Sequence, residues 1–474
     1  MKAILKLLPL MALLMPMVSC GDDEPEESIT NVTLLSQSIQ EGAEVDAAST
    51  TQITLTYNVP VKLSFAANIT LNDKKVEATS NATAIVIPVQ LQEGTSYTLQ
   101  VQAGSVVAVS NSKASAPSFT LKFKTPLADI PQTGNIPTKP LATAPEAVKL
   151  YHYLYKLYGK KVLSSVMANV NWNNECADKV YKLTGKYPAM NCYDFIHICY
   201  SGSWINYDDI SPVQAWTNAG GLVQLMWHFN VPKTQGATDV TCTPGETTFR
   251  ATNALKDGTW ENRWFYQQMD KVVSVLLKLQ QAGIAATWRP FHEAAGNATA
   301  KQQASWTNAW FWWGYDGADT YKKLWHTMFD YFKQKGVDNL IWVWTTQNYN
   351  GDSQQFAQDI DWYPGDQYVD IVGRDLYGEP AEANAREFQE VAVTYPTKMV
   401  ALAECGQGNG NQPGLISQCQ TAGALWSHFM VWYQGGQGST ETMCSDAWWQ
   451  DAMSCPDVIT RDEVPNLKQI YTQQ

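Results

Sequence analysis

The sequence predicts an α/β protein in which a (β/α)8 TIM barrel follows a small all-β domain. The 474 residues are too many for one ordinary domain and enough for a barrel with a second domain before it. All 19 tryptophans lie at or after Trp172, and no cysteine occurs between Cys20 and Cys176, so the composition changes along the chain. Beyond Glu146, strand-like and helical stretches alternate to the end, which is the pattern of repeated βα units.

The N-terminus has the features of a targeting segment. Two lysines flank the start of an apolar run, residues 4–18, that is too short to span a bilayer as a helix. The small residues before Cys20 resemble a bacterial lipobox, which predicts a signal peptide over residues 1–19 and a lipidated Cys20; a plain secretory signal is the alternative. The acidic linker over residues 20–27 resembles the surface-export signal of Bacteroidetes lipoproteins. We therefore expect an outer membrane lipoprotein exposed at the cell surface, with the periplasmic face as the alternative.

Residues 28–126 are predicted to form the all-β domain. Segments in which polar and apolar residues alternate are separated by Asn, Asp, Gly and Ser, which favour turns. The clearest of these segments are Thr51–Tyr57, Ala84–Leu91, Tyr97–Val101 and Ser118–Lys124. Roughly seven such strands in a domain of this size are typical of a β-sandwich. The stretch from Leu91 to Gly104, with the strand that follows it, resembles bacterial immunoglobulin-like spacer domains, which implies a spacer. Residues 127–145 contain four prolines and are predicted to be a stiff linker.

Residues 146–474 are predicted to form the barrel. The expected barrel strands are Lys161–Met167, Tyr187–Tyr193, Gly221–His228, Ala285–Phe291, Leu340–Thr345, Val369–Asp375, Met399–Glu404 and Ser427–Trp432. Apolar residues recur three and four positions apart in Trp260–Gln281 and in Thr320–Lys335, which predicts amphipathic helices. Gly283 and Gly336 follow these two segments and are expected to end the helices.

Charge and cysteine content exclude several classes of partner. The formal net charge of −12, without clustered Lys and Arg, argues against nucleic-acid binding. We expect no contact with a membrane beyond the lipid anchor, and a monomer. The eight cysteines after Cys20 permit disulfides in an exported protein, with Cys192/Cys199 and Cys444/Cys455 close in sequence, but their pairing stays open. No Cys-x-x-Cys motif or histidine cluster suggests a metal, and we expect no cofactor.

Two glutamates occupy the places where a barrel enzyme carries its chemistry. Active residues of such barrels lie at the C-terminal ends of the strands. Glu293 comes just after the fourth expected strand, and Glu404 ends the seventh. Glycoside hydrolysis uses a pair of carboxyl groups, one as proton donor and one as nucleophile or base, about 5 Å apart in retaining enzymes. A structural ion pair with Arg289 is the alternative interpretation of these residues.

Three motifs resemble those of glycoside hydrolase family 26. They are Trp288–Glu293 (WRPFHE), Ala309–Gly314 (AWFWWG) and Gly373–Tyr377 (GRDLY), and the resemblance extends from about residue 150 to residue 433. It implies a retaining β-1,4-mannanase with Glu293 as general acid/base and Glu404 as nucleophile. It further implies that the Tyr377 hydroxyl hydrogen-bonds the nucleophile. The residues expected to contact the substrate are His228, His292, Arg289, Trp310, Asp375, Tyr377 and Trp432. A negative charge on Glu404 would keep Glu293 protonated.

The remaining aromatic and histidine residues have ordinary structural interpretations. Trp312 and Trp313 are as suited to packing the barrel as to contacting a sugar. A lone histidine is usually structural, and four histidines are given that role: His152, His197, His326 and His428.

Several alternatives stay open. The expected substrate is β-mannan or galactomannan, cut internally. An exo-acting mannobiohydrolase, a β-glucan or xylan hydrolase of the same family, and a noncatalytic surface glycan-binding protein are the rivals. The sequence departs from the family in a long segment at residues 294–308 and in Tyr433, which stands where an arginine is common. These departures leave open the number of subsites and the tolerance of galactosyl branches.

Overall fold

The computed structural model describes residues 29–47, 49–91, 96–125, 135–296, 309–347, 359–436, 438–465 and 467. The chain divides into two compact units, one of which ends at Thr125 while the other contains the residues after it. Each unit has its own apolar core. The signal peptide, Cys20 and the acidic linker lie outside the described residues. No helix in the described ranges combines the length and the apolar character needed to cross a bilayer.

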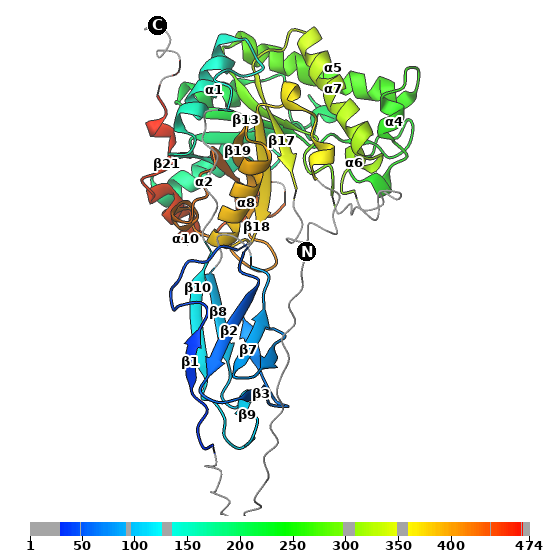
Figure 1. Ribbon diagram of the computed structural model, residues 1–474. Coiled ribbons are helices and arrows are strands. Elements are labelled where there is room, and N and C mark those ends of the chain that lie inside the picture. Colours follow the sequence, from blue (N-terminus) through cyan, green and yellow to red (C-terminus); the bar gives the residue numbers. More distant parts are fainter. Residues whose placement is uncertain are drawn as a thin grey trace, which may run out of the picture. The chain divides into compact units, whose positions relative to one another are not determined.

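The first unit is built from short antiparallel strands (Figure 1). One sheet has the order β1-β2-β7-β6, namely Leu34–Gln37, Gln52–Tyr57, Ala84–Pro88 and Thr79–Asn81. A second has the order β10-β8-β4-β5, namely Phe119–Lys124, Ser96–Val101, Ile69–Leu71 and Lys74–Lys75. The strands β3 (Val61–Leu63) and β9 (Val106–Ala108) pair separately. Alternate residues of β2 and β8 are buried, so each strand contributes one apolar face to the core, as its sequence pattern predicts.

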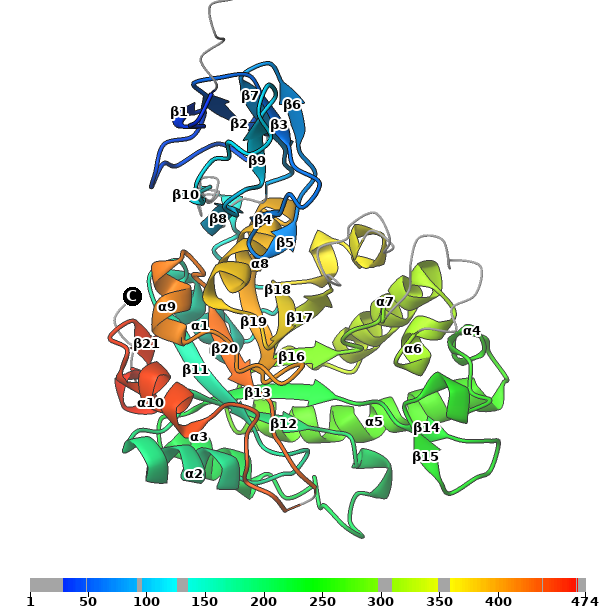
Figure 2. The same cartoon turned by 90° about the horizontal axis from the view of Figure 1, so that it is seen from below.

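The second unit is a closed barrel of parallel strands (Figure 2). The barrel strands are β11 (Val162–Met167), β12 (Met190–Asp194), β13 (Leu222–Trp227), β16 (Ala286–Pro290), β17 (Leu340–Thr346), β18 (Ile371–Tyr377), β19 (Met399–Gly406) and β20 (His428–Val431). They follow one another around the sheet, and pairing of β11 with both β20 and β12 closes it. The short β21 (Val458–Ile459) adds to β11, and β14 (Val231–Pro232) pairs with β15 (Val240–Thr241) outside the barrel. The expected (β/α)8 barrel is confirmed, with each of the eight predicted strands within a few residues of its observed position.

Helices surround the strands, as α5 and α7 show in Figure 2. The helices are α1 (Pro145–Leu157), α2 (Glu175–Thr184), α3 (Ser211–Asn218), α4 (Ala251–Ala254), α5 (Trp260–Gln281), α6 (Trp312–Tyr315), α7 (Ala318–Gln334), α8 (Ala381–Thr394), α9 (Ile416–Thr421) and α10 (Asp446–Ser454). The Thr259 hydroxyl caps α5 by accepting a hydrogen bond from the backbone N–H of Asn262 at 3.0 Å. Both helices predicted from periodicity are present, and each places its apolar stripe in the core.

The segment before α1 belongs structurally to the barrel unit. Ile136 and Ala142 are buried in the barrel core, and the backbone N–H of Leu141 donates to Asp370 at 2.8 Å. The described part of the expected proline-rich linker therefore packs as part of the barrel instead of bridging open space. The eight cysteines of this unit all carry free thiols.

Candidate active site

Three carboxyl groups converge at the C-terminal end of the barrel strands. Glu293 follows β16, Asp375 lies in β18 and Glu404 lies in β19. One oxygen of each lies within 4.8 Å of the others. The two glutamates predicted from the sequence are thus brought together across the barrel mouth, close enough for both carboxyl groups to act on one glycosidic bond.

The backbone that carries Glu293 is strained. The strand β16 ends at Pro290, and Phe291 and Glu293 then adopt φ values of 47° and 50°, in the left-handed region that non-glycine residues rarely enter. Close packing supports this turn, because a Cβ at Gly314 would lie 1.9 Å from the carbonyl oxygen of Ala294. The glycine that ends the WFWWG motif therefore lets α6 press against the residue next to Glu293.

Arg289 holds two of the three carboxylates. Its NH1 donates to Glu404 Oε1 at 2.6 Å, and its NH2 donates to Asp375 Oδ2 at 2.5 Å. The third nitrogen, Nε, donates to Thr345 Oγ1 at 2.7 Å. The side chain of Arg289 is 7% exposed, so its three nitrogens are engaged within the protein. The ion pair weighed as an alternative is present, and it organises the carboxylate cluster; the substrate contact expected of Arg289 stays a prediction.

Tyr377 supplies a second donor to Glu404. Its hydroxyl donates to Glu404 Oε2 at 2.5 Å, so the hydrogen bond expected between these two residues is present. The close approach of β18 to β19 makes this contact feasible, because a Cβ at Gly373 would lie 2.7 Å from the Cβ of Ala403. With Arg289 on one oxygen and Tyr377 on the other, the Glu404 carboxylate is fixed in direction and its charge is compensated.

Glu293 has a different electrostatic environment from Glu404. Burial raises the pKa of Glu293 well above its usual value, and the negative charges of Asp375 and then Glu404 raise it further, against a lowering by Arg289. Burial likewise raises the pKa of Asp375. Glu404 was expected to be the source of the effect on Glu293; in the structure burial is the larger cause and Asp375 the larger of the two charges. A glutamic acid that stays protonated near neutral pH can donate a proton.

Two histidines and a buried aspartate form a chain beside the carboxylates. Asp194 ends β12 and is fully buried; its Oδ2 lies 2.5 Å from Nδ1 of His228. The Nε2 atoms of His228 and His292 lie 3.1 Å apart. Burial lowers the pKa of His292 well below its ordinary value, as do His228 and Arg289, so the His292 ring is neutral. Because Nδ1 of His292 has no partner among the described residues, its proton is best placed on Nε2, where it donates to His228.

Aromatic side chains line the same end of the barrel. The rings of Trp432 and His228 have centroids 5.8 Å apart. Phe311 packs against both histidines, with centroid distances of 5.7 Å to His228 and 5.1 Å to His292. Trp310, its neighbour, is partly exposed. Trp432 therefore lies at the mouth as expected, and Phe311 is an aromatic wall that the sequence did not single out.

Trp312 and Trp313 pack the barrel. Both are fully buried, and their indole N–H groups donate to backbone carbonyls, Trp312 to Phe229 at 2.6 Å and Trp313 to His292 at 2.8 Å. The second bond holds the turn that precedes Glu293. Of the motif Ala309–Gly314, these two tryptophans therefore act from behind the site, whereas Phe311 faces the histidines.

The sequence did not indicate Asp194, Phe311 or Thr345. Asp194 directly follows the expected strand Tyr187–Tyr193, so the strand-end rule that found Glu293 could have found it too. Phe311 and Thr345 carry no local signal, because their roles depend on contacts with residues far away in the sequence.

The carboxylate cluster also has the side chains of a possible cation site. Glu293, Asp375 and Glu404 offer oxygen ligands of the kind that hard cations take. Arg289, however, already donates to two of the three, so the charge that a cation would balance is largely compensated.

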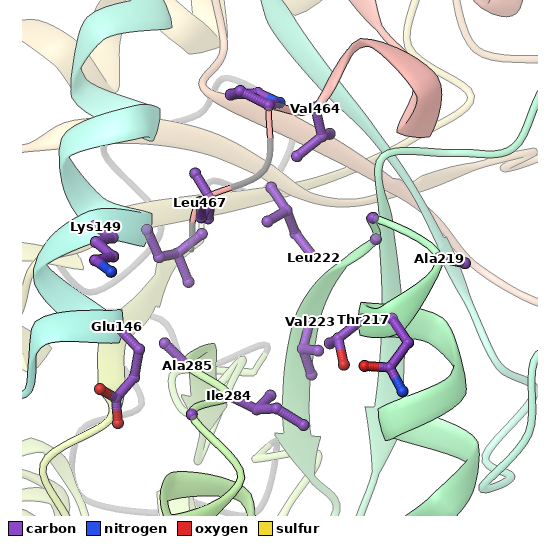
Figure 3. Close-up of a pocket in the computed structure, with 16 residues that line it drawn as sticks. Glu146, Lys149, Thr217, Ala219, Leu222, Val223, Ile284, Ala285, Val464 and Leu467 are labelled. Atoms are coloured by element: carbon purple, nitrogen blue, oxygen red, sulfur yellow. The ribbon is translucent and has the colours of Figure 1, made fainter. Parts of the chain in front are cut away.

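A separate cavity of about 510 Å³ lies at the opposite end of the barrel (Figure 3). Its lining includes Leu222 and Val223 at the start of β13, Ile284 and Ala285 before β16, and Val464. Barrels of this kind place their chemistry at the C-terminal end of the strands, and this cavity lies at the N-terminal end. It has no share in the carboxylate site.

The fold and the site define a class of protein: a (β/α)8 barrel whose opposed strands present one compensated carboxylate and one carboxyl group with a raised pKa, which is the arrangement of a glycoside hydrolase. The sequence profile of glycosyl hydrolase family 26 matches residues 139–453, and the chain belongs to this family.

Similar proteins agree with this membership. A mannan endo-1,4-beta-mannosidase of Thermothelomyces thermophilus is 31% identical over 69% of this chain and 61% of its own length. Mannan endo-1,4-beta-mannosidase B of a Piromyces species is 29% identical over 68% of this chain and 52% of its own length. The chain thus spans only about half to three fifths of these curated relatives.

Solved structures match the barrel unit. The GH26 domain of an endo-beta-mannanase/endo-beta-glucanase from Prevotella bryantii is 54% identical, with a TM-score of 0.66, over 69% of this chain and 99% of that domain. A beta-mannanase from a symbiotic protist of the termite Reticulitermes speratus, solved with a gluco-manno-oligosaccharide, is 32% identical, with a TM-score of 0.56, over 70% of this chain and 99% of its own.

Proposed function

We propose that this protein is a retaining endo-β-1,4-mannanase that hydrolyses β-mannan or galactomannan by double displacement. The unequal environments of Glu293 and Glu404 carry the proposal, because this chemistry needs one protonated and one ionised carboxyl group on either side of the scissile bond. The names of the relatives support mannan as substrate and internal cleavage as the mode of action.

In the first step, Glu404 attacks the anomeric carbon while Glu293 gives its proton to the departing glycosidic oxygen. The glycosidic C–O bond breaks and an ester bond to Glu404 forms. Glu404 is now neutral as an ester, which removes one of the charges that raised the pKa of Glu293. Glu293 then takes a proton from water, the water oxygen attacks the anomeric carbon, and the Glu404 carboxylate is released.

The surrounding residues support each step. Arg289 and Tyr377 fix the direction of Glu404 before attack. Trp432 and Phe311 offer apolar faces near the histidines, suited to the apolar face of a sugar ring. His228 and His292 offer ring nitrogens for sugar hydroxyls.

Digestion of unsubstituted mannan and of galactomannan tests the proposal. We expect an early spread of long oligosaccharides that shorten with time, which is the product pattern of internal cleavage. Release of disaccharide alone from the start would show exo action. Absence of reducing ends from either polymer would contradict a mannanase, and hydrolysis of β-glucan or xylan instead would name another substrate.

We further propose that the enzyme is an outer membrane lipoprotein anchored through Cys20 and displayed at the cell surface. The apolar run before Cys20 and the acidic residues after it support this location. Cys20→Ala should abolish incorporation of a fatty-acid label and release the protein from the membrane fraction. A variant that keeps both the label and the membrane association would contradict the anchor, and protease shaving of intact cells tests display at the surface.

A further inference from the structure

Trp204 differs from the other tryptophans of the described part of the chain in being exposed. Thirteen tryptophans there are buried, whereas the Trp204 side chain is 49% exposed. Leaving an indole in water forgoes the free energy of burying one of the largest apolar side chains. The position of Trp204 indicates which kind of ligand could cover the exposed indole.

Trp204 lies on the loop that connects β12 to α3, at the same end of the barrel as the carboxylates. This loop follows Asp194, the aspartate that contacts His228. It is also tied to the loop after β13, because Asn230 Nδ2 donates to the carbonyl of Ile196 at 2.9 Å. The loop is therefore built onto the rim of the candidate active site.

The loop holds its tryptophan in place through its own hydrogen bonds. The backbone N–H of Gly202 donates to the carbonyl of Ile205 at 3.1 Å, which closes a turn around Trp204. The hydroxyl of Tyr200 donates to the carbonyl of Thr238 at 2.9 Å. An aromatic side chain held in this way needs little ordering when a ligand arrives.

His197 packs against Trp204 and lies near the aspartate–histidine chain of the site. The rings of His197 and Trp204 have centroids 4.0 Å apart. Burial lowers the pKa of His197, while Asp194 raises it and His228 lowers it by smaller amounts, so His197 lies within electrostatic reach of the aspartate–histidine chain. Trp204 therefore packs on a histidine that lies near Asp194 and His228 of the candidate active site.

We propose that the Trp204 indole is the stacking platform of a distal subsite, which binds a sugar of the polysaccharide beyond those in contact with the carboxylates, with His197 as its support. An exposed indole face beside a polar imidazole suits a pyranose ring, which has an apolar face and a rim of hydroxyls. This inference rests on the proposed mannanase function and names a binding residue for the same substrate. His197, assigned an ordinary structural role from the sequence, becomes part of the binding surface.

The full-length protein tests the subsite with linear β-1,4-manno-oligosaccharides of increasing length, from the trisaccharide to the hexasaccharide. For Trp204→Ala we expect kcat/KM on the hexasaccharide to fall about five- to tenfold, from the loss of one ring stack. The effect should appear mainly in KM, and the trisaccharide should be cleaved as by the wild type. Trp204→Phe should recover most of the loss. Tyr181→Ala, which removes an exposed aromatic side chain from α2, should leave kcat/KM unchanged on both the trisaccharide and the hexasaccharide.

Two results would overturn the inference. Equal losses on all lengths would mean that Trp204 supports the catalytic centre itself, and unchanged kinetics on every length would mean that no sugar stacks there. Both differ from failure of the proposed function, in which the wild-type enzyme itself would cleave none of these oligosaccharides.

Discussion

Replacement of Asp194 by asparagine removes one charge from the fully buried aspartate beside His228 and leaves the shape of the side chain nearly unchanged. Asp194 Oδ1 accepts from the backbone N–H groups of Ile196 at 2.9 Å and His228 at 3.0 Å, so the asparagine carbonyl must take that place. The amide NH2 then faces Nδ1 of His228, which can no longer donate and must accept.

This change passes along the chain of histidines. The His228 proton moves to Nε2, where it faces Nε2 of His292 at 3.1 Å. The His292 proton must then move to Nδ1, a buried atom without a partner in the described part of the chain. An unsatisfied buried donor costs roughly 1–3 kcal/mol, which corresponds to a loss of about 5- to 150-fold in kcat/KM.

Steady-state kinetics on manno-oligosaccharides measures the loss, with circular dichroism as a check that the variant is folded. Asp178→Asn is the matched control, because Asp178 is a partly buried aspartate that accepts from Tyr187 on the outside of the barrel. We expect the control to have wild-type kinetics. A folded Asp194→Asn enzyme with wild-type kcat/KM would refute the role of Asp194 in setting the histidine tautomers.

Two further predictions concern stability and domain independence. Burial raises the pKa of Glu293 in the folded state above its unfolded value, so the wild type loses stability as the pH rises from the unfolded-state pKa to the folded-state pKa. Glu293→Gln removes this loss and should therefore raise the Tm more at pH 8 than at pH 4. An equal change in Tm at both pH values would contradict the raised pKa. A fragment starting at residue 135 should fold and cleave soluble mannan with wild-type kcat/KM, because the buried Ile136 is kept and the barrel has its own core. A folded but inactive fragment would show that the first unit helps to build the site.

The barrel could be predicted because its strands carry their signal locally. The strands β13 and β19 are buried along their whole length, which appears in the sequence as an apolar run interrupted only by Gln224 in β13 and by Glu404 near the end of β19. In the all-β unit, polar and apolar residues alternate clearly in β2 and β8. The strands β5 and β6 are short and exposed, so the hydropathy of the sequence does not predict them. Their pairing depends on neighbouring strands.

The site was predictable where strand ends and motifs coincide, as at Glu293 and Glu404. Contacts between distant residues were not predictable: nothing near Arg289 in the sequence shows that it bridges Asp375 and Glu404, 86 and 115 positions away. Nor does the sequence separate Trp313, which is buried behind the site, from Trp204, which is exposed at its rim.

The assignment of Glu293 and Glu404 to unequal roles is tested most directly by chemical rescue of their alanine variants with an aryl β-mannoside. Glu293→Ala should form its glycosyl-enzyme with this activated substrate and then stall, because the base for the second step is missing. Azide needs no base, and it should restore turnover and give a β-glycosyl azide. With Glu404→Ala, azide attacks from the vacated face and should give the α-glycosyl azide. An α product from Glu293→Ala, or full mannanase activity in either variant, would contradict the assignment.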